Sequence, residues 1–92
     1  MKTKIIIADD HVLFADGIKT LLERNPEFEV IDVANDGKEL LDLLNTVEPD
    51  VILMDINMPR LNGLEAVRKI QMQYKGIKVI MLSTYNDDHL IQ

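Results

Sequence analysis

Carboxylate side chains follow two short apolar runs of this 92-residue chain, and a hydroxyl follows a third. Asp9 and Asp10 come directly after the first run, Asp55 ends another, and Ser83 follows the last. Carboxylate oxygens are hard ligands that suit Mg²⁺ or Mn²⁺, and a divalent ion would neutralise acids that otherwise repel one another. Beside such an ion, Asp55 could act as a nucleophile toward a phosphoryl group, and Ser83 could offer its hydroxyl to a phosphoryl oxygen.

Each of these residues also has an ordinary structural explanation. An aspartate after a strand often caps the next helix or loop, and a serine there is most often a plain loop hydroxyl. His11 follows the acids, but Mg²⁺ prefers oxygen, so we expect this histidine to pack near the site in the first turn of a helix. The methionines are most simply core residues, at positions 54, 58, 72 and 81. Acids follow two of the apolar runs and a hydroxyl follows another. This joint occurrence favours a functional site over the structural explanations.

The apolar runs predict four buried strands. Each run is short and bounded by turn-forming or polar residues, as strands covered on both faces of a parallel sheet are. The predicted strands cover residues 5–8, 28–34, 51–54 and 79–82. In the second strand, we expect the buried residues to be Phe28, Val30 and Ile31.

The spacing of apolar residues between these strands predicts three helices. The faces expected to be apolar are Phe14, Ile18, Leu21 and Leu22 in the first, Leu40, Leu43, Leu44 and Val47 in the second, and Val67, Ile70 and Tyr74 in the third. Asp36 and Glu39 predict an N-cap with a capping-box partner for the second helix. Asn62 and Glu65 repeat that pattern before the third. Alternating strands and helices are typical of an α/β domain with a parallel sheet.

The composition narrows the class of protein. The apolar fraction of 47% is a normal globular value, and 92 residues make one domain or part of one. The chain has no cysteine, which excludes disulfides, thiolate metal sites and a cysteine nucleophile. A formal net charge of -6 argues against nucleic-acid binding by this chain alone. Because no run reaches the length of a signal-peptide core or a membrane span, we expect a cytoplasmic protein without membrane contact.

Several motifs together resemble the receiver domain of two-component response regulators. They are Ile-Ala-Asp-Asp-His at 7–11, Asp-Gly at 36–37, Ile-Leu-Met-Asp-Ile-Asn-Met-Pro at 52–59, Asn-Gly at 62–63 and Val-Ile-Met-Leu-Ser-Thr at 79–84. The resemblance covers the whole chain, so we expect residues 1–92 to be one response-regulatory domain. It implies an α/β fold with a doubly wound parallel sheet, the flavodoxin-like (CheY-like) receiver fold, and the strand order 2-1-3-4-5 is carried over from that family.

The same resemblance implies roles for individual residues. Asp55 would be the phosphoacceptor, a sensor histidine kinase would supply the phosphoryl group, and Ser83 would be the switch hydroxyl that closes on it. The implied ligands of Mg²⁺ (or Mn²⁺) are Asp9, Asp10, the Asp55 carboxylate and the backbone carbonyl of Asn57. Such a domain assists its own phosphorylation and dephosphorylation, and it is not an enzyme that acts on a separate substrate.

The first part of the chain looks like the receivers of LuxR-type transcription factors. Asp-Asp-His, Leu13-Phe14, Gly17-Ile18 and a Leu-Leu pair carry this similarity, although Ala15 stands where that subgroup often has arginine. Those proteins regulate transcription through a C-terminal DNA-binding domain, which these residues do not include. A complete receiver also continues with a fifth strand that ends in a lysine, and with a last helix. We therefore expect the fold to be truncated after the fourth strand and the start of the fourth helix.

The fourth predicted strand indicates that the chain pairs with a further strand. It is apolar on both faces and therefore should not be an edge strand, so something should pair beside it. In this chain the partner could be a second copy, in a homodimer or by strand swapping.

Two functions other than a phosphorylation switch stay open. A phosphatase of the haloacid-dehalogenase type uses Mg²⁺ and an aspartate nucleophile, and it characteristically has a second aspartate two residues later as acid/base. Here that residue is Asn57, which cannot donate and recover a proton in that role. The other alternative is a non-phosphorylated interaction or dimerisation module.

Overall fold

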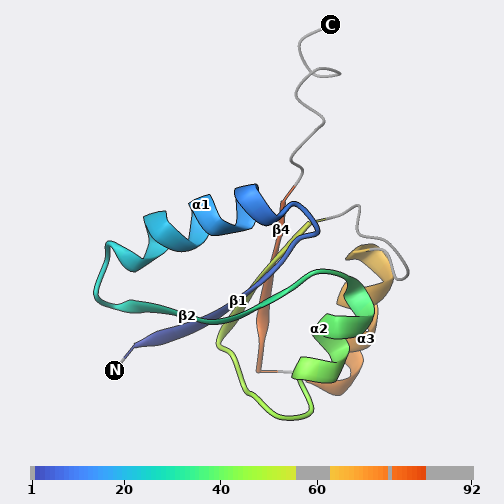
Figure 1. Ribbon diagram of the computed structural model, residues 1–92. Helices are drawn as coiled ribbons and strands as arrows, with labels where there is room; N and C mark the ends of the chain where they lie inside the picture. Colours follow the sequence, from blue (N-terminus) through green and yellow to red (C-terminus); the bar gives the residue numbers. More distant parts are fainter. Residues whose placement is uncertain (1, 56–62, 75, 83–92) are drawn as a thin grey trace, which may run out of the picture.

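A computed structural model describes residues 2–55, 63–74 and 76–82, and it has the predicted alternation of strands and helices (Figure 1). Within these ranges the strands are β1 (Thr3–Ala8), β2 (Phe28–Ala34), β3 (Val51–Asp55) and β4 (Lys78–Leu82). The helices are α1 (Val12–Glu23), α2 (Gly37–Leu43) and α3 (Gly63–Gln73). None of these helices combines the length and the apolar character that a membrane crossing requires.

The four described strands form one sheet in the order β2-β1-β3-β4, and all neighbours are parallel. This order agrees with the first four strands of the order carried over from receivers. Because β1 lies between β2 and β3, the chain leaves β1 toward one side and later returns to its other side. In open α/β sheets, such a reversal marks the carboxyl ends of the neighbouring strands, here β1 and β3, as the place where ligands bind.

Helices cover both faces of the sheet, with α1 on one face and α2 and α3 on the other (Figure 1). Successive side chains of β1 point to opposite faces. Ile5 and Ile7 pack in the cluster that contains Ala15 of α1, whereas Ile6 and Ala8 pack in the cluster formed with α2 and α3. The doubly wound arrangement predicted from the sequence is therefore confirmed.

A β-bulge in β2 adjusts which of its residues face each layer. The pairing with β1 shifts between Ile5 and Ile6, which leaves Ile31 as the extra residue. As a result, Val30 and Val33 both pack on the α1 side although they lie three residues apart. The residues expected to be buried in this strand are buried or half-buried: Phe28, Val30 and Ile31.

Helix α1 buries part of the predicted face, namely Ile18 and Leu22, but not all of it. Ala15, Ile18 and Leu22 pack against the sheet. Phe14 and Leu21 were expected on that face, but they are 41% and 61% exposed. The small Ala15 is 2% exposed in this contact, and the stripe that meets β1 and β2 is narrower than the apolar spacing indicates.

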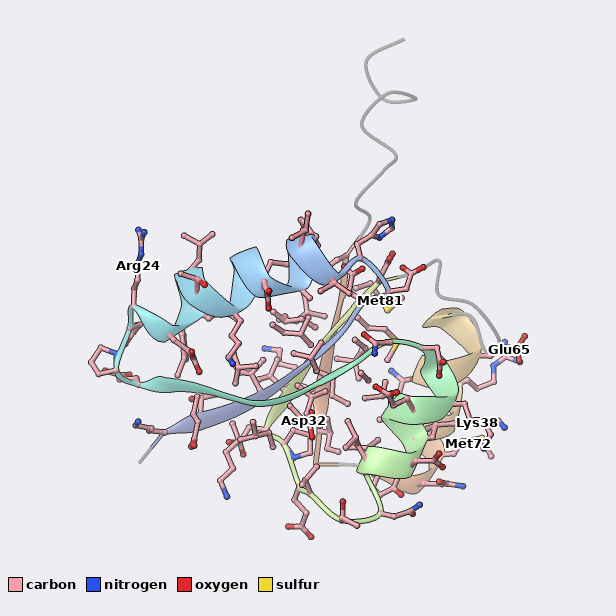
Figure 2. All side chains as sticks on the ribbon, viewed as in Figure 1. Arg24, Asp32, Lys38, Glu65, Met72 and Met81 are labelled. Carbon is pink, nitrogen blue, oxygen red and sulfur yellow. The ribbon has the colours of Figure 1, made fainter. Side chains whose placement is uncertain are left out.

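The methionines divide between the core and the surface. Met54 is fully buried in β3, and Met81 of β4 is half-buried, as expected for core residues. Met72 lies on α3 and is 74% exposed, so the prediction that it fills the core is wrong (Figure 2). Met58 lies outside the described residues.

Strand β4 occupies an edge of the described sheet, and the expectation of an interior strand is therefore not met in this part of the chain. Its apolar side chains are incompletely covered: Val79 and Met81 are half-buried, and Ile80 is 43% exposed. The strand thus offers an apolar surface and an unpaired backbone edge among the residues that the structure describes.

We predict that replacing Ile6 by alanine lowers the free energy of unfolding by about 2–5 kcal/mol, because this fully buried side chain would leave a cavity between β1 and the α2–α3 layer. Leu13→Ala is the matched control, since Leu13 is 86% exposed and its loss should cost less than about 0.5 kcal/mol. Urea unfolding followed by circular dichroism measures both. Equal losses would contradict the packing described above.

Candidate metal centre

The register of two neighbouring strands places two aspartates level with each other. Ala8 of β1 pairs with Met54 of β3, so the next residues along each strand are Asp9 and Asp55. The backbone N–H of Asp9 donates to the carbonyl of Ala34 at 2.9 Å, which extends the β1–β2 ladder to this residue. The first aspartate is thereby fixed at the carboxyl end of the sheet, beside the second.

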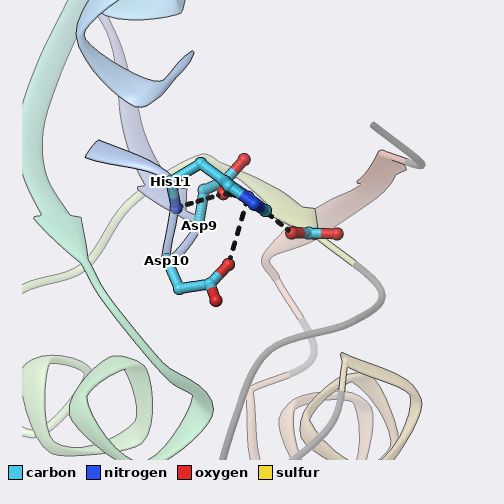
Figure 3. Close-up of side chains that lie close together, drawn as sticks. Asp9, Asp10 and His11 are labelled. Carbon is cyan, nitrogen blue, oxygen red and sulfur yellow. Dashed lines mark hydrogen bonds and ion pairs between the residues drawn. The ribbon is translucent and has the colours of Figure 1, made fainter. Parts of the chain in front are cut away.

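Four side chains converge at this point (Figure 3). Asp9, Asp10, His11 and Asp55 each offer one oxygen or nitrogen atom, and these atoms all lie within 4.8 Å of one another. Asp9 and Asp55 are fully buried, whereas the side chains of Asp10 and His11 are 35% and 57% exposed. The predicted convergence of the three acids is therefore confirmed, and the cluster is open to solvent on the side of Asp10 and His11.

Asp9 has one satisfied oxygen and one that lacks a hydrogen-bond partner. Its Oδ1 accepts from the backbone N–H of His11 at 2.8 Å. Its buried Oδ2 has no hydrogen-bond partner among the described residues. An unsatisfied polar atom in the interior costs free energy, so it needs a ligand to offset that cost. A divalent cation fits this position, because it would bind the free oxygen and neutralise the surrounding carboxylates.

His11 enters the cluster more closely than the sequence indicated. It is the N-cap residue of α1, but its side chain makes no capping hydrogen bond. Its Nδ1 lies 3.2 Å from Oδ1 of Asp9, 3.3 Å from Oδ1 of Asp10 and 3.9 Å from Oδ2 of Asp55 (Figure 3). The imidazole therefore lies against all three acids and does more than pack near them. Its position directly after the aspartate pair was the signal for this contact.

Two residues predicted to belong to the site lie outside the described residues. These are Asn57, whose carbonyl was expected to bind the metal ion, and Ser83, the expected switch hydroxyl. Their roles stay predictions.

The Asp-Gly motif after β2 has a structural role. Asp36 accepts a hydrogen bond from the backbone N–H of Glu39 at 2.8 Å, and Glu39 accepts one from the backbone N–H of Asn35 at 3.0 Å. The first hydrogen bond confirms the predicted N-cap at the start of α2, and the second ties Glu39 to the residue before the N-cap. Together they fix the turn that leads from β2 into the helix.

Comparison with known families identifies most of this chain. Residues 5–92 match the family model described as the response regulator receiver domain. The transcriptional regulatory protein DegU of Brevibacillus brevis is 46% identical over 90 residues, which are 98% of this chain and 38% of that protein. A protein-glutamate methylesterase/protein-glutamine glutaminase of Colwellia psychrerythraea is 47% identical over 84 residues, which are 91% of this chain and 22% of that protein. The chain thus spans well under half of either relative.

Solved structures give the same result. The signal receiver domain of the response regulator NarL from Mycobacterium tuberculosis superposes with a TM-score of 0.85 at 27% identity, over 98% of this chain and 73% of that one. The match to named transcription regulators agrees with the expected LuxR-type subgroup. With its sheet order, its helices on both faces and its acidic cluster at the carboxyl ends of β1 and β3, the chain belongs to the receiver domain family of two-component response regulators.

Proposed function

We propose that this chain is a phosphorylation-dependent switch that accepts a phosphoryl group on Asp55 from a sensor histidine kinase. The observation that carries the proposal is the position of Asp55, which ends β3 within 4.8 Å of ligand atoms from Asp9, Asp10 and His11. Membership of the receiver family supports it. A carboxylate held at the crevice of an open α/β sheet is in the right place to meet a ligand.

The chain's own residues would perform the transfer as follows. A carboxylate oxygen of Asp55 forms a bond to phosphorus while the bond from phosphorus to the donor breaks, and the donor leaves with that electron pair. The site would hold Mg²⁺ through Asp9, Asp10, Asp55 and the carbonyl of Asn57. When bound, the ion supplies positive charge that offsets the charge of the phosphoryl oxygens. Asp9 keeps its place through the backbone of Ala34 and His11, so little rearrangement is needed.

The response would be a change in the populations of two conformations. The hydroxyl of Ser83 would donate a hydrogen bond to a phosphoryl oxygen, which would favour the conformation in which Ser83 closes on that group. Hydrolysis would return the chain to its resting state. The phosphatase alternative lacks the second aspartate, because Asn57 stands two residues after the nucleophile.

The output we propose is regulation of transcription, through a DNA-binding domain outside these 92 residues. The support is that several relatives are named transcriptional regulatory proteins and that the chain spans only 38% to 41% of three of them. The net charge of -6 agrees with DNA contact being made elsewhere in such a protein.

A second candidate function, self-association, is favoured by the β4 edge. Ile80 is 43% exposed on a strand whose outer side pairs with no other described strand. A parallel or antiparallel strand from a second copy would satisfy the backbone groups of that edge and cover the apolar side chains. The chain would then act as a dimerisation module, with or without phosphorylation.

Phosphorylation at Asp55 predicts a specific mass change. Incubation with Mg²⁺ and acetyl phosphate should give a single phosphoryl adduct in the intact mass spectrum, and Asp55→Asn should abolish it. Asp16→Asn, which removes an exposed carboxylate on α1, should leave the adduct unchanged. An adduct that persists in Asp55→Asn would rule out this phosphoacceptor, whereas steady turnover of a phosphomonoester would favour the phosphatase.

Metal binding predicts a stability increment that depends on Asp9. At about 100 times its Kd, Mg²⁺ should raise the free energy of unfolding by about 2.7 kcal/mol. In Asp9→Asn this increment should disappear. In EDTA, however, that variant should be more stable than the unchanged chain by about 1–3 kcal/mol, because one of two buried like charges is gone. Urea unfolding in EDTA and in Mg²⁺ gives both numbers, and a less stable Asp9→Asn in EDTA would refute the repulsion.

Pairing through β4 predicts that the molar mass rises with protein concentration. Multi-angle light scattering at several concentrations should show this rise, and Ile80→Lys should suppress it by placing a charge on the edge strand. Met72→Lys is the control, since it adds the same charge on α3 at a side chain that is already 74% exposed. A strictly monomeric chain at all concentrations would exclude this candidate.

A further inference from the structure

We propose that His11 supplies a nitrogen ligand to the cation site, so that the site favours borderline transition-metal ions such as Mn²⁺ over Mg²⁺. This inference rests on the proposed function in one respect, namely that the same acidic cluster holds a divalent ion. It adds a residue that an all-oxygen Mg²⁺ site does not need. The consequence is metal selectivity that is set by the residue after the aspartate pair.

The spacing of the donor atoms fits a shared metal ion. Two neighbouring ligands of an octahedral ion, each about 2.1 Å from it, lie about 3 Å apart. His11 Nδ1 lies 3.2 Å from an oxygen of Asp9 and 3.3 Å from an oxygen of Asp10. Its 3.9 Å distance from Asp55 falls between the spacing of neighbouring ligands and that of opposite ligands, which is about 4.2 Å. One ion can therefore contact the imidazole and the carboxylates with only small shifts.

A second observation points to a ligand in the same place. Oδ2 of Asp9 is fully buried and has no hydrogen-bond partner in the described part of the chain. The other oxygen of this carboxylate already accepts from the backbone N–H of His11. The backbone of His11 thus orients Asp9, and the ring of the same histidine lies against the acidic cluster (Figure 3).

The imidazole is available for this role. It does not cap α1, and the contact between Nδ1 and Oδ1 of Asp9 at 3.2 Å depends on which ring nitrogen carries the proton. With the proton on Nε2, Nδ1 presents its lone pair to the cluster. Imidazole nitrogen suits transition metals, whereas carboxylate, carbonyl and water oxygens suit Mg²⁺. Removal of the ring should therefore weaken the binding of Mn²⁺ and of Mg²⁺ unequally.

Titration calorimetry of the 92-residue chain with MnCl₂ and with MgCl₂ tests the inference. His11→Ala should raise the Kd of Mn²⁺ by about tenfold or more, because even outer-shell partners of metal ligands are worth roughly 10–100-fold in affinity. The Kd of Mg²⁺ should change by less than about threefold, since this ion gains little from nitrogen. The side chain is 57% exposed, so the substitution leaves the core intact. His89→Ala removes the chain's other histidine and should change neither constant.

Pulsed electron paramagnetic resonance of the Mn²⁺ complex gives an independent measurement. Modulation from ¹⁴N directly bound to Mn²⁺ should be present in the unchanged chain and in His89→Ala, and it should be absent in His11→Ala. Absence of that signal in the unchanged chain, or an equal change in both dissociation constants, would overturn the nitrogen ligand. Tighter binding of both ions in His11→Ala would show that the ring only blocks the site. If neither ion binds any variant, the proposed metal-dependent function fails as well.

Discussion

The register between β1 and β3 is the constraint on which the rest of the site depends. Ile6 pairs with Ile52, and both side chains are fully buried against the α2–α3 layer. A slip of one residue would turn every side chain of a strand to the other face, so apolar packing fixes this register firmly. The same register makes Asp9 and Asp55 level at the end of the sheet. The packing of the apolar core thereby positions Asp9 and Asp55, which are not among its apolar residues.

The positions of these acids are electrostatically unfavourable unless a cation is bound. Two fully buried carboxylates lie side by side, and a third acid and an imidazole complete the cluster at its solvent side. Without a cation these acids repel one another, and the packing of the strands must offset that repulsion. Under the proposed function, a site held in this way would be arranged in advance for a divalent ion and a phosphoryl group. Under the proposed function, Asp9 and Asp55 would therefore lower the stability of the fold while they form the site.

Sequence patterns predicted the strands and the convergence of the acids, because unbroken apolar runs indicate buried parallel strands and parallel strands bring their carboxyl ends to one edge. They failed where the apolar spacing allowed more than one answer. On α1 the predicted face included Phe14, but the stripe that meets the sheet contains Ala15, which the apolar spacing did not include. The pattern of apolar residues gave no indication of the bulge at Ile31. The direction of the His11 ring depends on the extended backbone at the N-cap, which residue spacing does not encode.

The burial of the cluster also limits how a donor can reach Asp55 under the proposed function. The two innermost acids are fully buried, so access among the described residues is from the side of Asp10 and His11, where α1 begins. Val12 and Leu13 follow there, and they are 63% and 86% exposed. A protein donor that covered them would gain apolar contact while it excluded water from the acids. A small phosphodonor lacks that contact, so under the proposed function the start of α1 would favour transfer from a protein.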